Sequence, residues 1–208
     1  MEILDTWHTT GLNATASNDV QVDHVRVPAE RTFSLLDGAA RDPAPLYQWR
    51  WMFFSNIAAV PLGVARAAIE EGKSVASTKL VMPGLTYARD DPTVQDAIGR
   101  AESLVAASRA YLFDELGRVW DALQNGREPS ATEWSAFRLA NTYTFQSCKD
   151  AVGLVYEALG TTGIYRRSTL DRHLRDITTM GQHMLSQTKT FAACGRTLLG
   201  LEPGLIAF

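Results

Sequence analysis

Three long stretches of this sequence carry apolar residues three or four positions apart, which is the period of a buried helix face. They run from Leu46 to about Val75, from Val94 to Leu123 and from Trp134 to Leu159. A helix of about 30 residues is roughly 45 Å long, and long helices joined by short loops pack most easily as an antiparallel bundle. With a more polar helical region from Arg166 to about Leu199, the sequence predicts a mainly α fold, an up-and-down four-helix bundle.

Capping residues mark the ends of the second and third helices. Asp91-Pro92 is a favourable N-cap and first helical position, and Asn125-Gly126 is a favourable stop. Ser130 and Glu133 have the spacing of a capping box, in which each side chain accepts a hydrogen bond from the other residue's free backbone N–H. Pro61 interrupts the first helical pattern and should kink that helix or begin its second half.

The first 28 residues follow a different pattern. Four valines alternate with polar residues and run into Pro28, which predicts a strand with one buried face. These are Val20, Val22, Val25 and Val27. We therefore expect a short remnant of a β-domain at 1–30, a connector at 31–45, the helical bundle at 46–200 and an apolar tail at 201–208.

The composition narrows the class of protein. The 208 residues carry a net charge of -3, which points neither to nucleic acid nor to an anionic membrane surface. The sequence contains no apolar run near the ~20 residues of a membrane span, and MEILDTWHTT lacks the basic and apolar regions of a signal peptide. We expect a cytoplasmic protein in which Cys148 and Cys194 are reduced, buried thiols.

Candidate catalytic residues lie in the last helical region. If that helix is continuous, four polar residues at i, i+4, i+7 and i+11 form one stripe, with a histidine at its end. They are Arg172, Asp176, Thr179 and His183. Histidine exchanges a proton near neutral pH, but the same stripe also fits a solvated helix face. The four histidines lack partners at metal-ligand spacing, so no metal site is predicted.

Two motifs resemble the C-terminal half of the acyl-CoA dehydrogenase superfamily of flavoproteins. The opening resembles the D-x-W-x-x-x-G-(L/M)-R-G-T-G-S segment and V-x-V-x-D-V-x-V-P strands of the family's middle β-domain, with Asp5-Thr-Trp7, Gly11 to Ser17 and Val20 to Pro28. The end, from Arg175-Asp176 through Thr179 to His183, is similar to R-D-x-x-T-x-x-x-H of the monooxygenase branch. That branch includes oxygenase components of two-component aromatic hydroxylases and dibenzothiophene monooxygenase.

The resemblance implies a function and its partners. The opening strands would pair with an N-terminal part absent here, through truncation or because a companion chain supplies it. A flavin, FMN or FAD, would arrive reduced from a separate flavin reductase and would serve oxygen transfer to a small aromatic or hydrophobic substrate. His183 would be catalytic, with Arg175, Asp176 and Thr179 as supports. The family also implies a homo-oligomer, a dimer or tetramer, and the surplus of tryptophans agrees with association.

Other positions depart from the dehydrogenase pattern. Gly160 and Gly163 stand where dehydrogenases carry Q-x-x-G-G-x-G toward the flavin phosphates of a neighbouring subunit, but Glu157 replaces the glutamine and would repel a pyrophosphate. Gln95 matches a later glutamine of the family's FAD contacts, although the preceding R-x-x-F-G is missing. A dehydrogenase-like Y-E-G-T is missing as well. An FAD-dependent acyl-CoA dehydrogenase and a catalytically silent oligomerisation bundle remain the alternatives.

Overall fold

The computed structural model describes residues 1–34 and 42–204, so part of the expected connector and the end of the apolar tail lie outside the described residues. The strands are β1 Glu2–Leu4, β2 Asp19–Gln21, β3 Leu80–Val81 and β4 Thr86–Tyr87. The helices are α1 Pro45–Gln48, α2 Ala59–Thr78, α3 Pro92–Gln124, α4 Ala131–Ala158, α5 Thr169–Met180 and α6 Lys189–Leu198.

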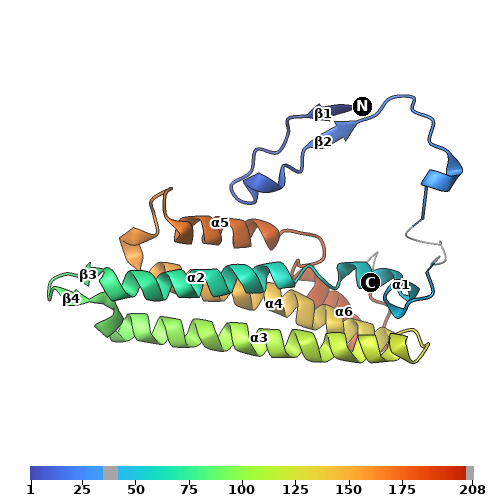
Figure 1. The fold of residues 1–208 in the computed structure, drawn as a ribbon. Coiled ribbons are helices and arrows are strands. Elements are labelled where there is room, and N and C mark those ends of the chain that lie inside the picture. The colour runs from blue at the N-terminus through green and yellow to red at the C-terminus, as the bar shows by residue number, and fades with distance from the viewer. Residues whose placement is uncertain (35–41, 205–208) are drawn as a thin grey trace.

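The long helices form the body of the molecule. α2, α3 and α4 lie side by side, α5 lies against α2 and α4, and α6 packs on α4 (Figure 1). Their facing sides bury a core that includes Ile69, Leu112, Phe137, Val152 and Ile177. The prediction of a mainly α bundle is therefore confirmed.

Local capping chemistry sets the helix starts. The Asp91 carboxylate accepts a hydrogen bond from the Thr93 backbone at 2.8 Å. Ser130 and Glu133 make both bonds of the capping box, at 3.2 and 2.8 Å. Pro61 lies in the first turn of α2, where its missing N–H costs nothing, so it begins the second half of the first helical pattern.

Among the described residues, Arg50–Thr78 is long and apolar enough to cross a bilayer, by length and composition only. A core helix passes the same test. Ala65, Ala68 and Ile69 from this segment are fully buried, and α2 packs against α3, α4 and α5. A third of the apolar window is buried inside the bundle.

The prediction of one strand through Val27 is wrong. β2 ends at Gln21 and pairs antiparallel with β1, in register Glu2 to Gln21. Val22, Val25 and Val27 are 54%, 58% and 55% exposed. Alternating valines form a strand where a neighbouring strand and a covering face exist, and in the described part of the chain β2 has β1 alone beside it.

Candidate functional site

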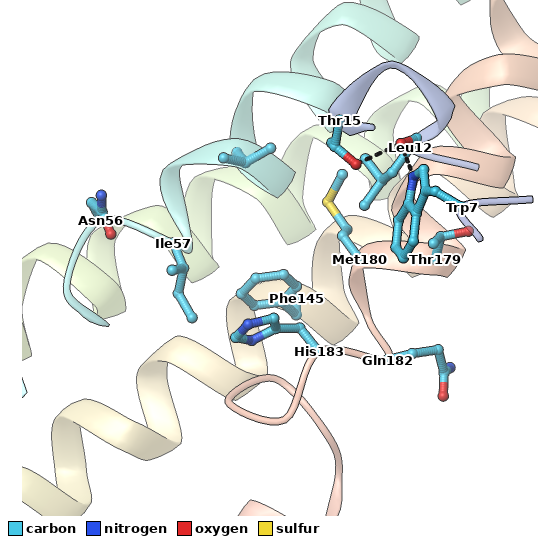
Figure 2. Close-up of a pocket in the computed structure, with 11 residues that line it drawn as sticks. Trp7, Leu12, Thr15, Asn56, Ile57, Phe145, Thr179, Met180, Gln182 and His183 are labelled. Carbon is cyan, nitrogen blue, oxygen red and sulfur yellow. Dashed lines mark hydrogen bonds between the residues drawn. The ribbon is translucent and has the colours of Figure 1, made fainter. Parts of the chain in front are cut away.

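A cavity of about 520 Å³ lies where the opening loop meets the start of α2, the middle of α4 and the end of α5 (Figure 2). Its size is that of a typical small-molecule site, and its walls are mostly apolar with a few polar groups. The lining residues are Trp7, Leu12, Thr15, Asn56, Ile57, Val60, Phe145, Thr179, Met180, Gln182 and His183.

His183 reaches this cavity from a turn, because the helical region from Arg166 to about Leu199 is two helices, α5 and α6, and the continuity on which the polar stripe depended is absent. α5 ends at Met180, with Gly181 as its C-cap, and the His183 backbone N–H bonds the Met180 carbonyl at 3.1 Å. The polar stripe from Arg172 is therefore broken before His183. The imidazole lies beside the Phe145 ring, with Ile57 on one side (Figure 2).

A backbone N–H orients the imidazole. Nδ1 of His183 accepts a hydrogen bond from the Leu185 nitrogen at 3.3 Å. An accepting Nδ1 in a neutral ring puts the proton on Nε2. The arrangement leaves Nε2 to exchange a hydrogen bond with a ligand.

Arg175 and Asp176 contact the opening loop and not His183. Nη1 of Arg175 donates to the Thr10 carbonyl at 2.6 Å, and the Asp176 carboxylate accepts from the Leu12 nitrogen at 2.7 Å. Within α5, Arg175 forms an ion pair with Asp171 at 2.8 Å. A solvated face of the predicted stripe would instead pair Arg172 with Asp176. Thr179 lines the cavity directly.

The glycines and Gln95 lie elsewhere. Gly160 and Gly163 follow the end of α4, and Gln95 is in the first turn of α3. These two helix ends lie near β3 and β4 (Figure 1). The 12 residues of α5 separate Gly163 from the turn that carries His183, about 18 Å of helix. A Cβ on Gly163 would meet the Tyr156 ring at 2.6 Å, so this glycine has a packing role.

Both cysteines are free and buried, as expected. Burial raises the pKa of the Cys148 thiol to about 12, and burial also raises the pKa of Cys194. Neutral thiols are poor nucleophiles and metal ligands. Within residues 1–34 and 42–204, no group of three His, Cys, Asp or Glu side chains is placed to hold a metal ion.

The sequence interpretation did not identify most of the cavity wall. Trp7 belongs to the opening motif, yet its position on the wall depends on its bond to Leu12, which Asp176 of α5 holds in turn. Phe145 fits the apolar face of its helix and looks like ordinary core. Ile57 and Met180 carry no local signal that separates a ligand wall from packing.

Comparison with known proteins gives a family and named relatives. The model of the acyl-CoA dehydrogenase C-terminal domain matches residues 55–188. Indole-3-acetate monooxygenase of Pseudomonas putida is 28% identical over 97% of this chain and 52% of its own length. The flavin-dependent monooxygenase oxygenase subunit HsaA of Mycobacterium tuberculosis is 28% identical over 98% of this chain and 54% of its own length. These relatives confirm the resemblance to the monooxygenase branch.

A solved structure supports the fold. XiaF from Streptomyces sp., in complex with FADH2 and glycerol, superposes with a TM-score of 0.89 at 23% identity, over 100% of this chain and 55% of that one. The chain spans about half the length of the curated relatives it matches.

Proposed function

The chain belongs to the acyl-CoA dehydrogenase C-terminal domain family, and from this premise we propose that it is the C-terminal part of a flavin-dependent monooxygenase. The complete enzyme uses reduced flavin and oxygen on a small aromatic or hydrophobic substrate. The single observation that carries the proposal is the largely apolar cavity in which the Phe145 ring and the imidazole of His183 lie together. The names of the relatives support the same activity.

The residues present fit a flat ring system. Trp7 and Phe145 offer aromatic faces, while Leu12, Ile57 and Met180 supply apolar contact. Bound reduced flavin supplies the reaction with oxygen. The protein's own contribution is to orient the substrate ring and to keep water away from the reacting atoms.

His183 is the residue we assign to proton handling. Its Nδ1 is occupied by the Leu185 N–H, so Nε2 holds or moves a proton at a hydroxyl or ring nitrogen of the substrate. Thr179 adds a hydroxyl on the same wall. Arg175 and Asp176 support the site at one remove, through the loop that they hold.

The cavity lining separates this proposal from the dehydrogenase alternative. An acyl-CoA dehydrogenase needs a carboxylate base over its substrate, and none of the 11 residues that line the cavity is Asp or Glu. A histidine is the titratable group instead. This chemistry favours oxygen transfer over removal of a carbon-bound proton.

The distant glycines belong to a second proposed contact. Next to this glycine segment lies a cavity of about 410 Å³, with Arg167, Ser168 and Thr169 in its wall together with the carboxylate of Glu71. We assign Gly160, Gly163 and Gln95 to the phosphate-bearing part of FMN or FAD held by a second copy. A homo-oligomer, a flavin reductase partner and a cytoplasmic location complete the proposal.

The test is the melting temperature of the chain with saturating FMN, FAD or indole, with each flavin in both redox states. A ligand at 100 times its dissociation constant adds roughly 2.7 kcal/mol of stability, which raises the melting temperature of a chain this size by roughly 5 °C or more. We expect a shift that shrinks in His183→Ala. No shift with any flavin or with indole would overturn the proposal and favour the silent bundle.

A further inference from the structure

We infer that Arg175 and Asp176 are positioning residues that act through Trp7. They hold the backbone of residues 10–12 against α5, a contact called the seat below. This contact fixes the Trp7 side chain, against which an uncharged aromatic ligand packs. The inference rests on the proposed function for its ligand. The seat itself is a structural feature that can be tested without any ligand.

Three contacts make the seat. Arg175 donates to the Thr10 carbonyl at 2.6 Å, and Asp176 accepts from the Leu12 nitrogen at 2.7 Å. Between them, Gly11 lies so close to the helix that an added Cβ would be 2.3 Å from the Arg175 carbonyl and 2.7 Å from the Thr179 hydroxyl. No side chain fits there, so the loop backbone rests directly on α5.

The Arg175 guanidinium is held in place for this contact by a neighbour on α5. The Asp171 carboxylate accepts from Nε and Nη2 of Arg175, at 3.0 and 2.8 Å, and this leaves Nη1 directed at Thr10. Hydrogen bonds with one ionised partner are shorter and stronger than neutral ones. The loop is therefore fastened to α5 by two charge-assisted bonds, one at a carbonyl and one at an N–H.

The seat is linked to the cavity wall by one residue. The Leu12 carbonyl accepts the Trp7 indole N–H at 3.0 Å and the Thr15 hydroxyl at 2.8 Å (Figure 2). Leu12 itself has a φ of 55°, which is left-handed and strained for a leucine. Asp176 thus binds the N–H of Leu12, and the Leu12 carbonyl binds Trp7. Trp7, Leu12 and Thr15 all line the cavity.

The charge of the lining defines the ligand class. None of the residues that line the cavity is Lys, Arg, Asp or Glu. A carboxylate taken from water into such a site would find no lysine or arginine to balance its charge and only neutral donors such as Nε2–H of His183, so its burial costs free energy that an uncharged ring does not lose. Indole is accordingly the probe, and indole-3-acetate is the charged comparison.

The first measurement is hydrogen–deuterium exchange of the 208-residue chain. We expect Asp176→Ala and Gly11→Ala to speed exchange in 5–18 about tenfold or more, because each removes a charge-assisted bond or the close approach. Exchange in α3 should stay unchanged, which shows that the bundle is folded. Asp150→Ala, at an exposed position of α4, is the matched control, and Asp176→Asn, which keeps an acceptor oxygen, should recover most of the protection.

The second measurement is indole affinity by NMR titration. We expect about tenfold weaker binding in Asp176→Ala and Gly11→Ala and less than about a twofold change in Asp150→Ala. Unchanged exchange in 5–18 overturns the seat, and faster exchange with unchanged indole affinity overturns its action through Trp7. Tighter binding of indole-3-acetate than of indole overturns the ligand class. If the unaltered chain binds no indole, the aromatic site of the proposed function is wrong and the ligand part of this inference with it, while exchange still decides the seat.

Discussion

The backbone N–H of Leu185 donates a hydrogen bond to Nδ1 of the His183 imidazole at 3.3 Å and fixes the orientation of the ring. Leu185 is buried, and its own carbonyl accepts a hydrogen bond from the Asn141 amide at 3.3 Å. Asn141 lies on α4, so the turn that carries the histidine is tied to the bundle core. The turn thus presents the His183 ring to the cavity with a defined tautomer and direction.

Substitution of His183 should change the preference for polar rings. We expect His183→Leu to weaken phenol binding about fivefold, because a net hydrogen bond contributes about 1 kcal/mol, and to leave toluene binding equal or tighter. His183→Gln, whose amide nitrogen lies near the Nε2 position, should keep most of the phenol affinity. NMR titration of both ligands measures this, and equal losses for phenol and toluene would argue that the ring only fills space.

Gly72 should tolerate no side chain. An added Cβ would be 2.5 Å from the Val155 side chain across the α2–α4 contact. We expect Gly72→Ala to lower the free energy of unfolding by about 1–3 kcal/mol despite the better helix propensity of alanine. Urea unfolding measures the loss.

Two variants check that explanation. Gly63→Ala, on the same helix with open space around it, should stabilise the protein by up to about 1 kcal/mol. Val155→Ala should reduce the penalty of Gly72→Ala in the double variant. Additive effects of the two changes would mean that the clash is relieved elsewhere.

The capping box should contribute less stability in acid. Hydrogen bonds from Arg127, and then those involving Ser130, lower the pKa of the Glu133 carboxyl from 4.5 to about 2. A folded pKa below the unfolded one gives stability that is fully present above about 4.5 and is lost as the pH falls toward 2. We therefore expect the protein to be more stable than Glu133→Gln at pH 6, with a smaller difference at pH 3, in urea unfolding. Glu128→Gln is the control, and a difference independent of pH would contradict the assignment.

The buried thiols should not react with thiol reagents in the folded protein. Cys148 is fully buried and its pKa is about 12, so the reactive thiolate is absent at neutral pH. We expect Ellman's reagent to titrate neither Cys148 nor Cys194 at pH 8 in buffer and both in concentrated urea. Rapid reaction of a thiol in buffer would show that the α4 or α6 packing opens locally.

The helices were predictable where their signals are local. α3 and α4 start at Asp91 and Ser130 because the capping groups lie within three residues of the N–H groups that they bond. Spacing along the chain did not show that the last helical region is divided into α5 and α6. Arg172, Asp176 and His183 have helical spacing, but hydrogen bonding within the turn after Gly181 directs the chain away from the α5 axis.

Periodicity and capping depend on neighbours along the chain, and they were enough to predict the helical class and the caps, while a local motif pointed to His183. The tertiary structure decided which residues share the cavity. Trp7 and Met180 line the same cavity because Asp176 bonds Leu12 across 164 positions of sequence, and no local pattern encodes that bond. Burial against a partner is a property of the assembled fold, which is why the valines after β2 are exposed while Phe145 lines the cavity.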